Sequence, residues 1–501
     1  MALVAPNLDV LVLARLIQGI GAAAAVVLSR VIINDTHTPR EAAARMATVM
    51  SATALAPMLA FSLGGVLYDL FGWRGAIGVT VLLGVIAFVV RLSEGMDDRK
   101  DWGYLIGTMA FLLTTFAATP IVSAGLRLTK AHFRRPFTRI AELNALSGII
   151  ILIILIPALQ TLPDSLTDPE KRVPDLWFNF PLGAPDVWQY VGVGTMVLAG
   201  LALLHFIALP DLAAARDHLQ PSWRQRLVSA LSLGWIGNLR AWKMQYLGVL
   251  TFGAIYLMSY PLVQTMFSSD FHASQVPGLK DAIFPATVTL VGLQGAVATL
   301  IVFMFVLRQT GGYANYIGTD QFWSLSKPLL AFSLLWFYFW WASFLTFWYG
   351  RTDGEVNVLQ LLFLGPYREV FMASLFLNFL GPMLALIWNP VRKSVWGPTL
   401  VAVFILIGSW LNMMRIYVSA SYVTDSELGN HYLHEVPSGM LMTNLVDLMM
   451  SVGAISASAL IFLLASKVIP VISIWEIGEG LRLVKVRSFY GRWVRVIAKS
   501  H

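Results

Sequence analysis

The feature that most constrains this chain is a series of long apolar stretches separated by short polar loops. A helix that spans a membrane needs about 20 mostly apolar residues, and twelve stretches meet that requirement. They lie near residues 9–33, 46–68, 74–92, 103–126, 143–162, 187–209, 244–267, 283–307, 328–349, 370–390, 397–419 and 442–468. Lipid does not tolerate unpaired backbone groups, so such stretches are expected as α-helices. The sequence therefore predicts an all-α, polytopic transmembrane helix bundle of about 12 helices.

Composition excludes several classes of protein. Only 13% of the 501 residues are charged, too few for the surface of a soluble protein of this size. The absence of cysteine excludes thiolate-held iron–sulfur clusters, cysteine zinc sites and c-type haem. Of the eight histidines only His205 falls in a predicted span, so a haem with two axial imidazoles is not expected. We expect no metal or haem on this chain, and no nucleic-acid binding, because its positive charge is spread over loops.

Basic loops predict the orientation, because Lys and Arg accumulate on the cytoplasmic side of a membrane. Two loops are rich in them, between the fourth and fifth and between the sixth and seventh predicted helices, and the tail at 481–501 is basic too. The loop residues are Arg127, Lys130, Arg134, Arg135 and Arg139, then Arg216, Arg224, Arg226, Arg240 and Lys243. We therefore expect a multi-pass protein of the bacterial inner membrane with a cytoplasmic C-terminus.

The same rule gives conflicting orientations on the two sides of residues 91–101. Arg30, Arg40 and Arg45 place the first loop in the cytoplasm, which leaves the connector 91–101 cytoplasmic as well. The nine helices that follow need this connector outside. We therefore predict a three-helix segment at 1–95, a nine-helix transmembrane domain at 96–480 and a basic cytoplasmic tail at 481–501.

The first segment resembles part of a known transporter family. The carrying residues are Ala14-Arg15-Leu16-Ile17-Gln18-Gly19-Ile20-Gly21, Leu55-Ala56-Pro57, Gly64-Gly65 and Phe71-Gly72-Trp73-Arg74. This stretch is similar to the fourth to sixth helices of major facilitator drug:proton antiporters of the Bcr/CflA type. The resemblance implies a proton-coupling role for Arg15 beside Gln18, and close helix approach at Pro57, Gly64 and Gly65. It covers about ninety residues, so a fused or remnant segment is the alternative to a working transporter.

Residues from about 102 to 490 resemble a second family. The carrying motifs include Arg134-Arg135-Pro136, Leu209-Pro210-Asp211, Trp388-Asn389-Pro390, Ile469-Pro470-Val471 and Trp475-Glu476. They are similar to the NrfD/polysulfide-reductase membrane subunits, including the quinol-binding subunits of alternative complex III. The resemblance implies a quinol or menaquinone site, and extrinsic iron–sulfur or cytochrome c partners. Ala117 and Gln189 stand where quinol-oxidising relatives commonly carry a His and an Asp, so binding is expected to survive better than rapid oxidation.

Polar groups in or near the predicted spans are the candidates for quinone binding or proton handling. They are Glu142, Gln189, His205, Asp211, Tyr338, Arg415 and Asp447. Ion pairs with the basic loops are an equal explanation for Glu142 and Asp211, and a mutual pair is one for Arg415 and Asp447. His205 can simply bond a neighbouring helix, and Tyr338 lies in an aromatic run that favours lipid contact. We assign no catalytic residue.

The leading hypothesis is a quinol- or quinone-binding membrane subunit of a bacterial respiratory oxidoreductase, NrfD-like and active in electron transport. Such a chain would be a subunit that depends on its partners rather than an autonomous enzyme, and it would contact membrane lipid. Two alternatives stay open at this point. One is a drug/proton antiporter-related transporter, based on the first segment; the other is a non-catalytic membrane anchor of a redox complex.

Overall fold

The computed structural model describes residues 75, 77–96, 98–162, 185–428, 430–489 and 492–497. Within them, ten helical segments are long and apolar enough to cross a membrane. Each coincides with one of the predicted stretches from 74–92 onward. The all-α polytopic bundle is therefore confirmed, while the predicted stretches 9–33 and 46–68 lie outside the described residues.

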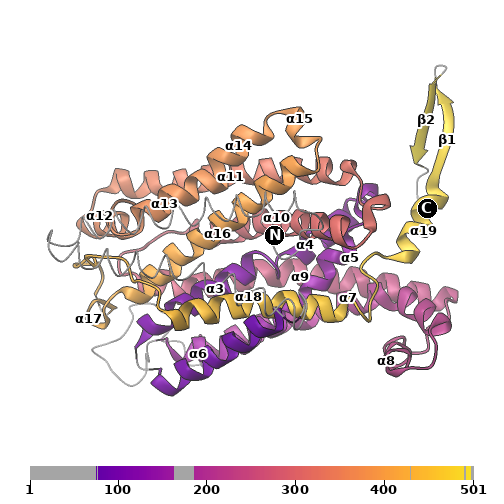
Figure 1. Ribbon diagram of the computed structural model, residues 1–501. Coiled ribbons are helices and arrows are strands. Elements are labelled where there is room, and N and C mark those ends of the chain that lie inside the picture. Colours follow the sequence, from indigo (N-terminus) through magenta and orange to yellow (C-terminus); the bar gives the residue numbers. More distant parts are fainter. Residues whose placement is uncertain are drawn as a thin grey trace.

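The spans run side by side along one common axis (Figure 1). In chain order they are the helix Ile77–Glu94; η2 (Arg99–Trp102) with α3 (Gly103–Thr114) and α4 (Thr119–Leu128); α5 (Thr138–Leu143) with η4 (Asn144–Leu146) and α6 (Ser147–Gln160); α7 (Asp186–His218); α9 (Leu239–Phe271) with η6 (Ala273–Gln275); α10 (Phe284–Thr310); α11 (Thr319–Gly350); α13 (Arg368–Leu375) with the π-helical segment Phe376–Leu380 and α14 (Gly381–Leu386); α16 (Trp396–Tyr422); and α18 (Leu445–Ala465).

Shorter elements connect the spans, most of them near the two ends of the bundle (Figure 1). They are η3 (His132–Arg134), α8 (Trp223–Leu231), η7 (Tyr313–Asn315), α12 (Asp353–Leu359), the π-helical segment Gln360–Leu364, α15 (Asn389–Arg392), α17 (Asp425–Leu428) and α19 (Ile474–Leu483). We call the end with α8, α19 and the loop between α4 and α5 the arginine-rich end, and the opposite end, with α12 and α17, the α17 end.

The predicted tail contains an element that the sequence analysis did not anticipate. After α19, strands β1 (Val484–Phe489) and β2 (Arg492–Ile497) pair in antiparallel register, with Val484 opposite Ile497 and Phe489 opposite Arg492. This hairpin projects away from the helices at the arginine-rich end (Figure 1). It is a small addition to a fold that is otherwise helical throughout the described residues.

The second described span is broken in its middle, between α3 and α4. Thr114 and Thr115 donate their hydroxyls back to the carbonyls of Ala110 and Phe111, and a proline occupies the first turn of α4. A break in lipid is tolerated only where other groups satisfy the freed backbone. Two tyrosines of α9 do so here.

Those tyrosines bond the carbonyls on both sides of the break. The Tyr256 hydroxyl donates to the Ala117 carbonyl at 2.5 Å, and the Tyr260 hydroxyl donates to the Leu113 carbonyl at 3.2 Å. Both side chains are buried. The break is therefore a fixed feature of the core, positioned by α9.

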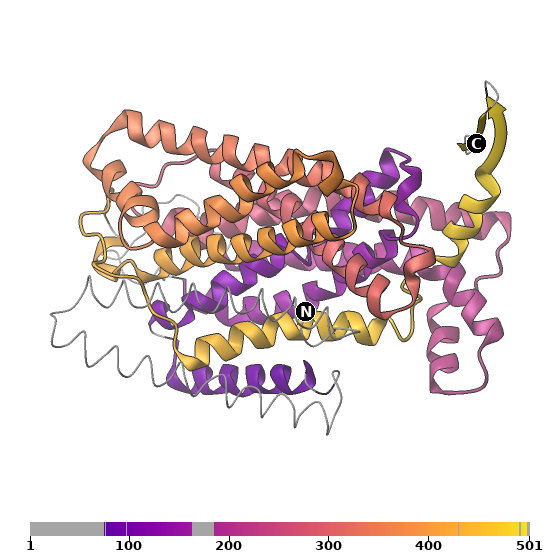
Figure 2. The ribbon, with the colours of Figure 1, turned by 45° about the horizontal axis from the view of Figure 1, so that its top comes forward.

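The helix Ile77–Glu94 packs along α18 at the side of the bundle (Figure 2). A Cβ added at Gly84 would lie 2.5 Å from the Gly453 Cα, so the two backbones approach closely only because both residues are glycine. Arg91 then pairs with Asp447 at 2.8 Å, and both side chains are buried. The predicted pair between Arg415 and Asp447 is thus wrong, because Arg91 occupies that carboxylate.

The glycine contact yields a test of this packing. Gly84→Ala and Gly453→Ala are each expected to lower the free energy of unfolding by about 1–3 kcal/mol, because a methyl group would force the helices apart. The matched control is Gly78→Ala in the same helix, where an added Cβ meets nothing within 4 Å. Thermal unfolding in detergent would measure all three, and equal stability of Gly84→Ala and Gly78→Ala would contradict the packing described.

Candidate functional site

A stripe of polar side chains runs along the face of α9 that meets the broken span. Tyr256, Tyr260, Gln264 and Ser268 follow at every fourth residue and are all buried. Residues four apart share one face of a helix, so the spacing alone aligns them. The Gln264 amide donates to the Tyr260 hydroxyl at 2.8 Å, which links the stripe to the carbonyls of the break.

A second stripe continues along α4 toward the arginine-rich end. Thr119, Ser123 and Arg127 are again spaced by four residues. The Thr119 hydroxyl donates to the Ala141 carbonyl at 2.9 Å, and the Ser123 hydroxyl donates to Glu142 at 2.5 Å. The break thus connects, through buried polar groups, to a fully buried carboxylate on α5.

Glu142 belongs to a network of ion pairs at this end. Arg127 pairs with it at 2.6 Å and Arg139 at 3.4 Å, and Arg139 also reaches Asp211 of α7 at 2.8 Å. Asp211 in turn accepts the backbone N–H groups of Ile474 and Trp475, both at 3.1 Å. The network therefore joins α4, α5 and α7 and holds the start of α19.

A second carboxylate completes this network from α19. Glu476 accepts from Arg127 at 2.5 Å, from Arg134 at 2.8 Å and from the Thr138 hydroxyl at 3.0 Å. Burial alone would raise the pKa of Glu476, but the charges of Arg127 and Arg134 and their hydrogen bonds outweigh it and lower the pKa to about 2. Glu476 is therefore ionised at neutral pH.

A second polar cluster lies at the other end of the α9 stripe. The Gln189 amide of α7 donates to the Asp270 carboxylate of α9 at 2.6 Å. Ser274 and Gln275 donate to the Asp270 backbone carbonyl at 2.8 and 3.0 Å. Arg99 donates to the Gln275 side-chain oxygen, so this cluster connects Asp270 to the α17 end of the broken span.

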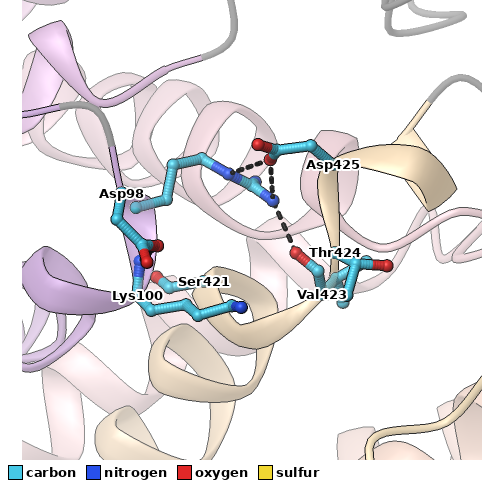
Figure 3. Close-up of a pocket in the computed structure, with 7 residues that line it drawn as sticks. Asp98, Lys100, Ser421, Val423, Thr424 and Asp425 are labelled. Atoms are coloured by element: carbon cyan, nitrogen blue, oxygen red, sulfur yellow. Dashed lines mark hydrogen bonds and ion pairs between the residues drawn. The ribbon is translucent and has the colours of Figure 1, made fainter.

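Arg99 also borders a cavity of about 300 Å³ at the α17 end (Figure 3). The cavity is lined by Asp98, Arg99, Lys100, Ser421, Val423, Thr424 and Asp425. Arg99 pairs with Asp425 at 3.1 Å and donates to the Val423 carbonyl at 2.6 Å, while Lys100 and Asp98 face the same space. Polar groups therefore follow one another from this cavity, past Asp270 and the break, to Glu142.

The structure brings together three of the seven predicted site residues. Glu142, Gln189 and Asp211 belong to the polar groups just described, and for Glu142 and Asp211 the ion-pair alternative is what the structure shows. Arg415 lies apart, donates to the Leu362 carbonyl and to Asn412, and sits over the ring of Phe363. Asp447 pairs with Arg91 at the side of the bundle.

The other predicted residues lie away from these groups. His205 is half-buried on α7 with its ring beside Phe206, and Tyr338 is 63% exposed on α11. The residues Arg15, Gln18, Pro57, Gly64 and Gly65 lie outside the described residues.

Sequence reasoning missed Asp270 and Glu476. Asp270 fell just beyond the predicted span 244–267, although α9 continues to Phe271. Glu476 was named only within the motif Trp475-Glu476 and was not proposed as a site residue. The sequence did carry a signal for further carboxylates, because four arginines, at 127, 134, 135 and 139, lie close to the predicted spans. Glu142 and Asp211 alone are too few to neutralise them.

Part of this chain is similar to known transporters. A family model described as Major Facilitator Superfamily matches residues 1–163. An uncharacterized MFS-type transporter, YdgK of Bacillus subtilis, is 37% identical over 108 residues, covering 21% of this chain and 27% of its own. The methylenomycin A resistance protein of B. subtilis is 33% identical over 132 residues, covering 24% and 28%. The drug efflux pump JefA of Mycobacterium tuberculosis is 35% identical over 96 residues, covering 19% of each chain.

These matches support one predicted resemblance and overturn the other. The chain spans about a quarter of the length of the first two relatives. The family match includes the ninety or so residues where the major facilitator resemblance was expected and continues to residue 163, into the segment predicted to be NrfD-like. The relatives are named for transport, resistance and efflux. The assignment to NrfD, polysulfide reductase and respiratory electron transport is therefore wrong, while a multi-pass membrane protein is correct.

Several expectations stay predictions. They are a bound quinone or menaquinone, extrinsic iron–sulfur or cytochrome c partners, and contact with membrane lipid. The division at 1–95, 96–480 and 481–501 also stays a prediction, although Arg91 and Gly84 pack across the first of these boundaries.

The Glu476 ion pairs predict a strong pH-dependent contribution to stability. Glu476→Gln is expected to cost about 3–5 kcal/mol at pH 7, because Arg127 and Arg134, whose side chains are only 12% and 14% exposed, lose the buried counter-charge that they share. A pKa lowered from 4.5 to about 2 means that the stabilisation is complete above pH 4.5 and is lost as the pH falls toward 2. Thermal unfolding of both proteins between pH 7 and 3 measures it, and the difference should shrink only below pH 4.5.

The matched control is Glu479→Gln, one turn along α19. Glu479 makes one ion pair, with Arg135 at 3.2 Å, and its side chain is 41% exposed. An exposed pair contributes under about 1 kcal/mol. A loss of stability for Glu476→Gln no larger than that of Glu479→Gln would disprove the role given to Glu476.

Proposed function

We propose that this chain is a membrane transporter that exports small organic molecules, antimicrobial compounds among them, in exchange for protons. The observation that carries the proposal is the Major Facilitator Superfamily match over residues 1–163, together with relatives named for drug efflux and resistance. The broken span α3–α4 belongs to that matched segment. The following features of the bundle support the same function.

The break between α3 and α4 supports transport. Discontinuous helices near the middle of a membrane supply the backbone groups that bind substrates and coupling ions in many secondary transporters. Here the break exposes the carbonyls of Leu113 and Ala117 to two tyrosine hydroxyls, in the middle of a span that runs from Arg99 to Leu128. A polar substrate group that displaced a tyrosine hydroxyl would find the same acceptors.

Two buried carboxylates support coupling to protons. Asp270 lies at the α17 end of the polar stripes and Glu142 at the arginine-rich end, and both are buried. Carboxylates inside a membrane are costly and typically mark ion or proton pathways. The hydroxyls of Tyr256, Tyr260, Thr119 and Ser123 lie between them and can both donate and accept a hydrogen bond.

Orientation follows from the charges. The arginine-rich end carries the basic loops, so we place it in the cytoplasm of a bacterium and the cavity at Arg99 outside the inner membrane. The C-terminus would then be cytoplasmic. In this orientation, Asp270 is the carboxylate nearer the external medium.

Expression of the full chain in a bacterial host without its major efflux pumps tests the function directly. We expect raised resistance to several lipophilic antimicrobials and faster export of ethidium, both abolished when a protonophore collapses the proton gradient. Arg15→Ala should reduce export at least tenfold, because the resemblance gives that residue a proton-coupling role, whereas Arg40→Ala in the adjoining loop should not. Wild-type protein that inserts into the membrane and exports nothing would refute the proposal.

Asp270→Asn tests the coupling path. Asparagine keeps an oxygen for the Gln189 amide but cannot take up a proton, so proton-driven export in proteoliposomes should fall at least tenfold. Exchange of labelled for unlabelled substrate without a gradient should persist, because binding does not need the proton. Asp353→Asn, an exposed carboxylate at the same end, is the control; proton-driven export by Asp270→Asn at the control rate would exclude Asp270 from the path.

A further inference from the structure

A cluster of cationic groups surrounds one indole where α11 meets α15. The Lys327 ammonium lies 4.0 Å from the centre of the Trp323 ring, and the Lys393 ammonium lies 5.2 Å from it. Lys327 is one turn beyond Trp323 on α11, and Lys393 caps α15. Two positive charges from different helices therefore lie close to one aromatic ring.

The cluster lacks a negative charge of its own. Among the described residues neither lysine has a carboxylate within 4.0 Å, and Asp320, one turn before Trp323, pairs with neither. The buried indole nitrogen of Trp323 has no acceptor either. Every polar group that this cluster leaves unsatisfied is a donor, and its natural complement is an anion with several oxygens.

The position of the cluster in the fold indicates that it lies close to the membrane surface. α16 ends beside the cavity at the α17 end, so α16 begins at Trp396 on the arginine-rich side, as does α11 at Thr319. Trp388 and Trp396 flank α15 and are 66% and 40% exposed. Exposed tryptophans of this kind lie at the level of lipid headgroups. Lys327 and Lys393 are themselves exposed, so a headgroup can approach them.

We propose that Lys327, Lys393 and Trp323 bind the phosphate headgroup of an anionic phospholipid. The two ammonium groups neutralise the phosphodiester, Trp323 holds both lysines in place through its ring, and the acyl chains lie along the apolar surface of α11 and α14. Basic pockets between helices at the cytoplasmic face are suited to such lipids. This site is independent of the transport path, since none of its residues belongs to the polar stripes.

Lipid retention by the full chain tests the site. The protein is purified in detergent with a ninefold excess of phosphatidylcholine over phosphatidylglycerol, and the phosphatidylglycerol bound per chain is measured by mass spectrometry. Wild type should be enriched in phosphatidylglycerol, and Lys327→Gln/Lys393→Gln should retain at least about tenfold less. Lys243→Gln/Lys467→Gln removes the same charge from exposed lysines outside the cluster and should retain the wild-type amount.

Three results would overturn the proposal. One is equal retention by the cluster variant and the control variant. Another is displacement of the lipid by millimolar inorganic phosphate, which would make free phosphate the occupant. The third applies if the double variant unfolds: the single variant Lys393→Gln, at the exposed end of α15, should still lose about threefold, and retention at the wild-type level would exclude the site.

Discussion

The pairing of Arg139 with two carboxylates organises the arginine-rich end. Its guanidinium is fully buried and reaches Glu142 on its own helix and Asp211 on α7. A buried charge left unpaired costs several kcal/mol, so α5 and α7 are held together. Asp211 also binds the first backbone N–H groups of α19, which brings Glu476 to Arg127 and Arg134. Four separate segments of the chain thus depend on one set of neutralised charges.

The broken span is stabilised by uncharged hydrogen bonds to its backbone rather than by ion pairs. Its free carbonyls bond tyrosine hydroxyls rather than charged groups, so the break lies between two charged clusters without carrying charge itself. Hydroxyls rotate at little cost and can exchange one partner for another. A donor group of a ligand can therefore replace a tyrosine hydroxyl at one of these carbonyls, and the carbonyl stays hydrogen-bonded. Breaking an ion pair would instead leave a buried charge without its partner. The physical division is therefore between rigid ends and an adaptable middle.

Hydropathy predicted the spans well and the interactions between them poorly. The ten described spans lie where apolar length placed them, because the bilayer imposes that length on every helix. The break between α3 and α4 was not predicted, since threonines and a proline interrupt the helix without interrupting its hydropathy. The partner of Asp447 was also missed. Adjacent helices suggested Arg415, but Arg91 arrives from a segment more than 350 residues earlier in the chain.

Asp270 shows a third limit of sequence reasoning. A lone carboxylate near the end of an apolar stretch reads as the start of a loop, and only the path of α9 places it in the core. Gln189 was selected because it can bond a carbonyl, yet the structure gives it a carboxylate partner instead. The chemistry of Gln189 therefore predicted that it would form a hydrogen bond, whereas the identity of its partner depends on the packing of α7 against α9.

The helix Ile77–Glu94 limits how the bundle can move in a transport cycle of the kind proposed. Separating it from α18 would take Arg91 away from Asp447 and leave that carboxylate without its counter-charge at the side of the bundle, where lipid cannot solvate it. Separating α5 from α7 at the arginine-rich end would likewise remove the counter-charge of Asp211, because Arg139 would stay with Glu142 on α5. α9 contacts α3 and α4 through tyrosine hydroxyls, and η6 adds one bond from Arg99 to the uncharged Gln275. Hydrogen bonds to uncharged partners are cheaper to exchange than buried ion pairs. Relative movement of α9 against α3 and α4 is therefore one route that breaks no buried ion pair of the described residues.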